Sequence, residues 1–310
     1  MHAFYADQFV LPLPAGHRFP MSKYQLLRER LHGLDGLQMC QAPEATDGEL
    51  ALVHTPAYLS SVIDGTLNPV QQREIGFPWS EAMVARARRS VGATVSAARS
   101  ALVSGLAANL AGGTHHASAD KGSGFCVFND AAVAARLMQA EWHRAHRELL
   151  RVAVIDLDVH QGNGTALIFR DDPTVFTLSI HGAKNFPFRK ECSDLDVELP
   201  DGCDDDPYLS ALDAALTELW RRHEAHPPAL IFYLAGADPH EGDRLGRLKL
   251  TTQGLAERDR RVFTAAFERG IPVAISMAGG YGRVIEDTVE VHASTIAEGM
   301  RSWRRWNNTA

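Results

Sequence analysis

Residues 151–157 read RVAVIDL, a short run that is apolar at almost every position. Three further runs share this character, namely TVFTLSI at 174–180, ALIFYL at 229–234 and PVAISM at 272–277. Short runs rich in Val, Ile and Phe, apolar on both faces, are typical of strands buried between helices in a parallel sheet. We therefore predict central parallel strands at these four places.

Segments of helical length alternate with these runs, at residues 130–147, 207–226 and 252–269. A longer helix is expected over 80–106, broken or frayed near Gly92. Thr251 or Thr252 suits the N-cap of the third helix, and Gly270 suits the position just after its end. The alternation predicts an α/β fold in a single domain over residues 1–310, with a mostly parallel β-sheet flanked by helices on both faces.

Composition narrows the class of protein. The chain has 310 residues, of which 45% are hydrophobic and 22% charged, as in ordinary globular domains. Its formal net charge of −7 argues against direct nucleic-acid binding, which needs a concentrated basic face. We expect neither a signal peptide nor a membrane span, and the four cysteines form no CxxC pair. These features predict a cytoplasmic protein and leave its oligomeric state open.

The end of the first run carries the most unusual chemistry, because Asp156, Asp158 and His160 follow one another at alternate positions. Ligands of open parallel sheets bind outside the carboxyl ends of the strands. In an extended segment these three side chains would share one face. Buried carboxylates crowded in this way need a cation, so the pattern favours a metal site. The alternative is a solvated polar loop.

Three more polar clusters follow strand-like runs or glycine pairs. Asp238 follows ALIFYLAGA, where it serves either as a third metal ligand or as a helix N-cap. With Asp158 and His160 it would leave the fourth position of zinc open for water, the pattern of a catalytic site. His115 and His116 follow a glycine pair, and Tyr281 stands in GGYG at 279–282. Each cluster alone has an ordinary explanation, but together they predict one active site.

Five stretches of the chain together resemble the histone deacetylase family, within the arginase/deacetylase fold. They are GGTHHASADKGSGFC, VIDLDVHQGNG, LSIHG, AGADPHEGDRLGRL and AGGYG, in family order from about residue 15 to the C-terminus. The stretches QGNG and EGDRLGRL look most like the class IV branch. The resemblance implies a zinc-dependent hydrolase that removes acetyl or longer fatty acyl groups from lysine side chains of proteins.

The resemblance also implies roles for individual residues. The zinc (Zn²⁺) ligands would be Asp158, His160 and Asp238. His116 would be the principal general base and acid, His115 would tune the electrostatics, and Tyr281 would be the catalytic tyrosine. The acyl-lysine tunnel would be formed by Gly124, Phe125, Phe186 and, at its mouth, Leu245.

A structural potassium (K⁺) site is implied as well. Asp156 would stand behind His115 and contribute to this site together with Ser179 and Ile180. One position departs from many family members, since Asn163 stands where they pair the second histidine with an aspartate. An amide orients the His116 ring without stabilising its charged form, so we expect a lower pKa for His116 than an aspartate would give.

Three other functions remain in view at this stage. A small-molecule amidohydrolase such as an acetylpolyamine deacetylase would use the same zinc site, with an acidic residue at the mouth where this chain has Leu245. Glu241 and Asp243 lie close to that position in the sequence. An arginase-like enzyme with two manganese ions would need more carboxylates near Asp238. A non-enzymatic acyl-lysine binder would be expected to lack a ligand, the histidine pair or Tyr281.

Overall fold

Eight strands form one sheet in the order β2-β1-β3-β8-β7-β4-β5-β6, and every neighbouring pair is parallel. This computed structural model describes residues 1–308, so positions 309–310 of the expected domain lie outside the described residues. The strands are β1 His2–Tyr5, β2 Gln38–Gln41, β3 Leu106–Asn109, β4 Val152–Asp156, β5 Val175–Gly182, β6 Leu195–Leu199, β7 Leu230–Leu234 and β8 Val273–Ser276.

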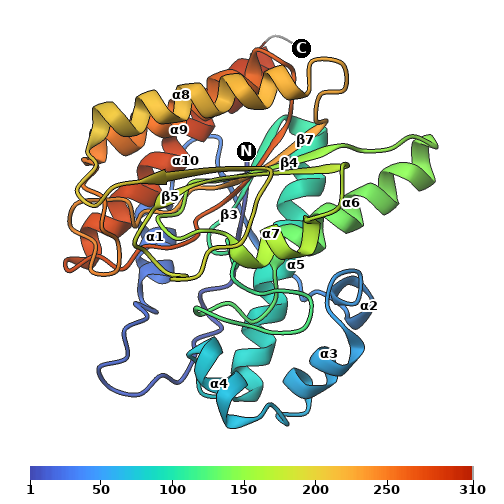
Figure 1. Cartoon of the computed structure of the whole chain (residues 1–310), viewed down its shortest axis with the longest axis vertical. Coiled ribbons are helices and arrows are strands. Elements are labelled where there is room, and N and C mark those ends of the chain that lie inside the picture. Colours follow the sequence, from blue (N-terminus) through green and yellow to red (C-terminus); the bar gives the residue numbers. More distant parts are fainter. Residues whose placement is uncertain (309–310) are drawn as a thin grey trace.

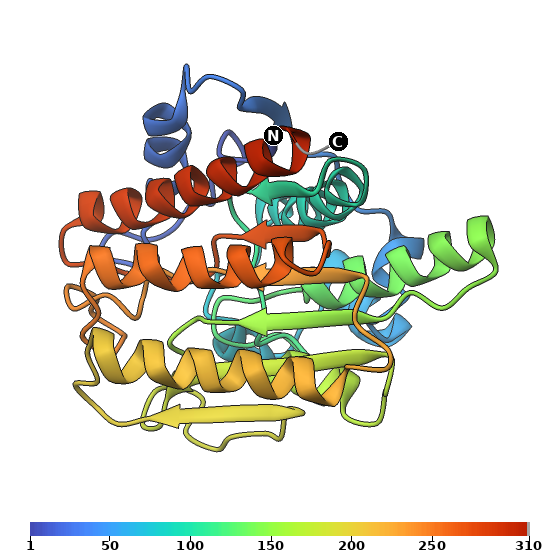
Figure 2. The same ribbon diagram turned by 90° about the horizontal axis from the view of Figure 1, so that it is seen from above.

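Helices cover both faces of the sheet (Figure 1). Helices α8, α9 and α10 lie together on one face, as the view from above shows (Figure 2), while α5, α6 and α7 lie on the other. None of the helices within residues 1–308 is long and apolar enough to cross a membrane. The helices are α1 Lys23–Leu31, α2 Asp47–Leu50, α3 Pro56–Ile63, α4 Pro69–Ile75, α5 Glu81–Ser104, α6 Asp130–His146, α7 Asn163–Phe169, α8 Asp205–Arg222, α9 Thr252–Phe267 and α10 Ile285–Asn308.

Alternate side chains of each central strand enter different hydrophobic cores. On β4, Ala153 and Ile155 pack with the α8, α9 and α10 side, while Val152 and Val154 pack with the α5 and α6 side. Because both faces of these strands are buried, they read in the sequence as continuous apolar runs. The prediction of a parallel sheet flanked on both faces is confirmed.

The four predicted strands are present, and four more complete the sheet. The expected break near Gly92 is wrong, because α5 runs unbroken from Glu81 to Ser104. Gly92 instead allows close packing, since a Cβ there would lie 2.1 Å from the carbonyl oxygen of Pro43. The helix predicted at 207–226 begins and ends earlier, at Asp205–Arg222. Thr251 is the N-cap of α9, as predicted, and accepts a hydrogen bond from the Gly254 amide.

The ends of four adjacent strands are level with one another. Asp156 at the end of β4 pairs with Leu234 of β7, which pairs with Ser276 of β8, which pairs with Asn109 of β3. The loops that follow these strands therefore leave the sheet at the same edge. They carry all four of the polar clusters predicted from the sequence.

Candidate metal centre and active site

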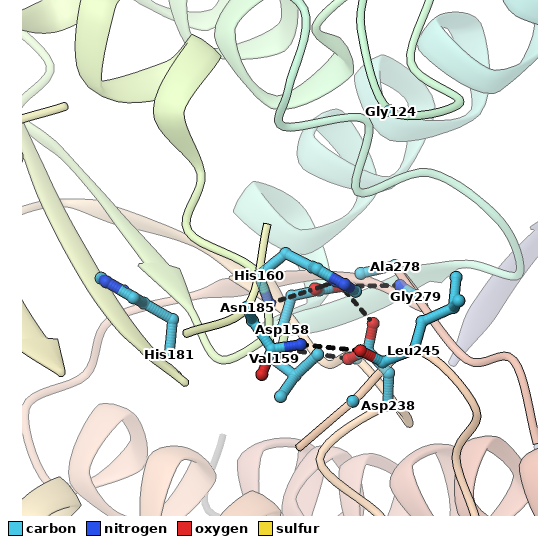
Figure 3. A network of polar contacts seen from close by, with 12 residues as sticks. Gly124, Asp158, Val159, His160, His181, Asn185, Asp238, Leu245, Ala278 and Gly279 are labelled. Carbon is cyan, nitrogen blue, oxygen red and sulfur yellow. Dashed lines mark hydrogen bonds and ion pairs between the residues drawn. The ribbon is translucent and has the colours of Figure 1, made fainter. Parts of the chain in front are cut away.

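Three side chains converge at this edge, and their potential ligand atoms all lie within 4.8 Å of one another. They are Asp158 and His160 from the loop after β4, and Asp238 from the loop after β7. The Nδ1 atom of His160 is 2.9 Å from Asp158 Oδ1 and 3.2 Å from Asp238 Oδ2. Figure 3 shows the three groups turned toward one another. All three residues are buried.

Backbone amides fix the two carboxylates in place. Asp158 accepts hydrogen bonds from the amides of His160 (2.9 Å) and Gly279 (2.7 Å), and Asp238 Oδ1 accepts one from Val159 (2.9 Å). Gly279 must be glycine for this approach, since a Cβ there would lie 1.9 Å from Asp238 Oδ2. The backbone thus presents the carboxylates at a fixed spacing before any ion binds.

The donor set of this cluster fits a divalent cation. Asp238 Oδ2 is buried and accepts no hydrogen bond from the described residues. Burial, followed by the charge of Asp158, raises the pKa of Asp238 to about 7. Burial alone would lower the pKa of His160, but Asp158 and Asp238 raise it to about 10. Without an ion, the cluster must therefore take up protons to offset its negative charge. Two oxygens and one nitrogen are suitable ligands for zinc with one open position.

The two tandem histidines lie in the turn after β3 rather than on a strand, and their ring centroids are 4.1 Å apart. His115 Nδ1 is 2.6 Å from Asp156 Oδ2, so Asp156 contacts this ring and does not join the three-residue cluster. The prediction that Asp156, Asp158 and His160 share one face is wrong in this respect, because β4 ends at Asp156 and the next residues follow a bend. His116 Nδ1 is 2.7 Å from Asn163 Oδ1.

Different partners give the two histidines opposite pKa shifts. Burial would lower the pKa of His115, but the charges of Asp156 and Asp158 raise it to about 9. Burial lowers the pKa of His116 well below its usual value, and the charges of His115 and His160 lower it further. The amide of Asn163 opposes this only weakly. His116 is therefore neutral near pH 7 and able to accept a proton, whereas His115 is held as a cation.

Tyr281 lies in the loop after β8 and lines the same cavity as Asp158 and His160. Its backbone amide donates to the carboxylate of Asp243 at 2.6 Å, and Asp243 also accepts from the amides of Leu245 and Gly246. Asp243 is thus buried, and these hydrogen bonds hold the Tyr281 loop in place. It does not line the outer opening of the pocket. Lys23, also buried, donates to the carbonyls of Ala278 and Gly280.

Two cavities meet at this site. An inner cavity of about 70 Å³ is lined by Asp158 and by apolar side chains that include Leu11 and Met83. An outer cavity of about 1090 Å³ opens to the surface. Both are lined by His116, Gly124, Phe125, His160 and Tyr281.

The remaining residues expected in the tunnel also line the outer cavity. Phe186 and Leu245 do so, and the ring centroid of Phe186 is 4.9 Å from that of His116. Gly124 has a φ of +54°, and a Cβ there would lie 2.5 Å from His116 Cδ2. Glycine at this position therefore leaves the His116 ring free at the junction of the two cavities.

The residues expected at the potassium site lie on neighbouring strands. Asp156 of β4 and Ser179 of β5 are register partners, and Ile180 follows Ser179 in the same buried strand. The Ser179 hydroxyl is 2.9 Å from His181 Nδ1. His181 is well separated from the three clustered side chains in Figure 3.

Two buried groups that organise the site were missed by the sequence reasoning. Arg258 of α9 donates to the carbonyls of Leu157 (3.3 Å) and Gly236 (2.7 Å), and so ties together the loops after β4 and β7. Asp130 at the start of α6 accepts from the amides of Gly113 (3.0 Å) and Thr114 (2.7 Å), just before the histidine pair. Both positions look like ordinary polar residues of amphipathic helices, so no sequence signal distinguishes them.

Comparison with known proteins agrees with this architecture. Residues 17–296 match the family described as "Histone deacetylase domain". An uncharacterised protein of Picosynechococcus sp. is 47% identical over 93% of this chain and 95% of its own length. Histone deacetylase 2 of Arabidopsis thaliana is 34% identical over 80% of this chain and 65% of its own length. A crystal structure of a histone deacetylase homologue complexed with SAHA superposes with a TM-score of 0.79 and 25% identity, covering 97% of this chain and 83% of its own. The chain has the arginase/deacetylase fold and belongs to the histone deacetylase family of hydrolases.

Proposed function

We propose that this protein is a zinc-dependent lysine deacylase, which removes acetyl or longer acyl groups from lysine side chains of proteins. The observation that carries the proposal is a single constellation at the junction of two cavities. It combines the Asp158, His160 and Asp238 cluster with a neutral His116 and the Tyr281 side chain. These are the parts that hydrolysis of an amide requires, namely a Lewis acid, a base and an oxyanion donor.

The zinc would be held by His160 Nδ1 and by carboxylate oxygens of Asp158 and Asp238. When bound, it supplies Lewis-acid polarisation of the amide carbonyl and lowers the pKa of a water molecule toward neutrality. His116 is neutral because it is buried and lacks a carboxylate partner, so it accepts the proton of the attacking water. His116 then passes that proton to the departing lysine amine.

Tyr281 would stabilise the negative charge that develops on the carbonyl oxygen. Burial, followed by the charges of Asp158 and Asp238, raises the pKa of Tyr281 well above its usual value, so the hydroxyl keeps its proton and donates it as a hydrogen bond. Oxyanion donors of this kind contribute about 10² to 10³ in rate. His115, held positive by Asp156, keeps the neighbouring His116 from being protonated before the reaction.

The acyl-lysine side chain would pass Phe125, Phe186 and Gly124, with Leu245 at the mouth. The inner cavity would receive the acyl group, since it continues beyond the metal ligands between apolar side chains. We further propose that the Asp156 carboxylate, the Ser179 hydroxyl and backbone carbonyls near Ile180 bind a structural potassium ion, which would offset the charge behind His115. Asn163 and the EGDRLGRL stretch support a class IV-like branch of the family.

The alternative functions fit the structure less well. An acetylpolyamine deacetylase would favour an acidic mouth, whereas Leu245 is flanked there by Arg244 and Arg247. A second metal ion would need more ligands near Asp238, but among residues 1–308 the metal-binding group is limited to three side chains. The imidazole of His240 instead contacts the Gly242 amide and Thr252.

The test is an activity panel on lysine peptides that carry acetyl through long fatty acyl groups, with an acetylpolyamine as the competing substrate. We expect at least one acyl-lysine peptide to be hydrolysed, with activity lost to a chelator and restored by Zn²⁺. Turnover of the acetylpolyamine alone would refute the lysine assignment. Tyr281→Phe should retain metal and lose activity by about 10² to 10³. Tyr5→Phe is the matched control, because Tyr5 lies on β1 and lines neither cavity.

A further inference from the structure

The outer cavity is strongly basic, although the chain as a whole carries a formal charge of −7. Its lining contains seven cationic side chains against two acidic ones, Glu74 and Glu191. We call the seven cations the mouth cluster: Arg18, Arg73, Lys121, Lys184, Arg189, Arg244 and Arg247. The charge that an approaching substrate meets is therefore opposite in sign to the net charge of the protein.

Most of this charge is not neutralised within the part of the chain that the structure describes. Lys184 and Arg247 both lie near Asp201, at 3.8 and 3.1 Å. Among residues 1–308, the other five members have no carboxylate within ion-pair distance, whereas Glu191 is already paired with Arg170 at 2.6 Å. Arg244 is held in place by the carbonyl of Tyr281 at 2.9 Å, next to the reaction site.

The mouth also exposes an aromatic side chain among these charges. Phe188 is 85% exposed, lines the outer cavity and makes an edge contact with Phe186 at 6.2 Å. An exposed aromatic residue beside unpaired cations is a typical anchor for a polypeptide, which offers both apolar and charged side chains. A cavity of about 1090 Å³ is also far larger than one acyl-lysine side chain requires.

We propose that the mouth cluster selects acyl-lysines that lie in acidic polypeptide segments, with Asp or Glu on either side of the modified lysine. This inference rests on the proposed lysine deacylase function and names its substrate class. Flanking carboxylates would pair with the five cations that have no carboxylate partner among the described residues, and a lysine- or arginine-rich segment would meet like charges. Polyamines, which are cationic, would be disfavoured for the same reason.

The experiment uses three peptides of equal length with the same acyl-lysine at the centre, flanked by Glu, Gln or Lys. We expect kcat/KM to fall in the order Glu, Gln, Lys, with the first and last differing by about tenfold or more at low salt. Raising the salt from about 50 mM to 500 mM should remove most of this difference, because exposed charges are screened. Equal rates, or faster turnover of the Lys-flanked peptide, would overturn the proposal.

Two variants localise the effect. Arg73→Glu combined with Arg189→Glu should reduce or reverse the Glu-to-Lys ratio, since both side chains are exposed at the mouth. Arg144→Glu on α6 is the matched control, because Arg144 is exposed but does not line the cavity, and it should leave the ratio unchanged. A ratio that is the same in the double variant and the wild type would count against the mouth cluster.

Fluorescence anisotropy measures binding of the same peptides. It separates the proposed deacylase function from the proposed preference for acidic segments. Tighter binding of the Glu-flanked peptide without hydrolysis of any peptide would refute the deacylase function and support acidic recognition. Hydrolysis without any charge preference would support the deacylase function and refute acidic recognition. Two competitors, single-stranded RNA and an unacylated acidic peptide, are then compared for displacement of the Glu-flanked peptide. If the RNA displaces it at the lower concentration, the surface binds nucleic acid and the proposal is overturned.

Discussion

Replacing Asn163 by Asp changes the partner of the proposed base and should shift its pKa upward. The side-chain oxygen of Asn163 is 2.7 Å from His116 Nδ1, so Asn163→Asp places a carboxylate against the ring with almost no change in shape. The protein already contains a histidine–aspartate pair at the preceding residue, His115. His115 is 2.6 Å from Asp156, and that charge helps raise the pKa of His115 to about 9.

The size of the effect follows from Coulomb's law. A charge pair about 4 Å apart at an effective dielectric constant of about 20 gains about 4 kcal/mol. Because one pKa unit corresponds to about 1.4 kcal/mol, the acidic limb of the kcat/KM profile should move to higher pH by up to about three pH units. The direction of the pKa shift follows from the negative charge of the new carboxylate, which stabilises the protonated His116 ring. A protonated ring cannot accept a proton from water. Activity at low pH should therefore fall.

The assay is a pH profile of kcat/KM for the wild type, Asn163→Asp and Asn163→Ala, with metal content measured for each protein. Asn163→Ala removes the hydrogen-bond acceptor without adding charge, so it should lower the rate without moving the limb upward. An acidic limb that coincides in Asn163→Asp and the wild type, with metal retained, would refute the assignment of His116 as the titrating base.

Two further substitutions test how the site is held together. Gly279→Ala should abolish stoichiometric metal binding, because its Cβ would lie 1.9 Å from Asp238 Oδ2; a full equivalent of metal in the purified variant would contradict this. Arg258→Met should lower the free energy of unfolding by about 3–5 kcal/mol, since it leaves the buried carboxylate of Asp259 without its cation. Chemical denaturation measures this, and Arg260→Met on the same helix, whose side chain is 54% exposed, should cost less than about 1 kcal/mol.

The sequence predicts the centre of the fold better than its edges. The strands β4, β5, β7 and β8 are buried on both faces, so their apolar runs are distinctive. The edge strands β2 and β6 are partly exposed and short, with sequences QMCQ and LDVEL that carry no clear strand pattern. The strand β3 reads LAAN, in which alanines fit the tight contact with α5 but have low strand propensity.

The candidate site was predictable where side chains follow the buried strands and not where they support them from elsewhere. Asp158, His160 and Asp238 lie just beyond strands that the sequence identifies. Arg258 holds the loops after β4 and β7, and Asp130 holds the loop after β3, from helices whose positions only the fold shows. The charge of the mouth was equally hidden, because its cations come from helix α4 and from several loops spread between Arg18 and Arg247. Net charge is a sum over the chain and says nothing about one cavity.

The hydrogen bonds of the two carboxylates hold the donor atoms of one candidate metal site at this edge of the sheet. Three of their four oxygens already accept from backbone amides, which leaves Asp238 Oδ2 as the oxygen without a hydrogen-bond donor among the described residues. Asp158 Oδ1 and Asp238 Oδ2 both lie near His160 Nδ1, so the donor atoms of the three side chains gather around one point. The amides that hold these carboxylates belong to the loops after β4 and β8. A second ion would need further ligands, and among residues 1–308 the metal-binding group consists of these three side chains. Stabilisation of those loops and binding of one cation therefore depend on the same hydrogen bonds.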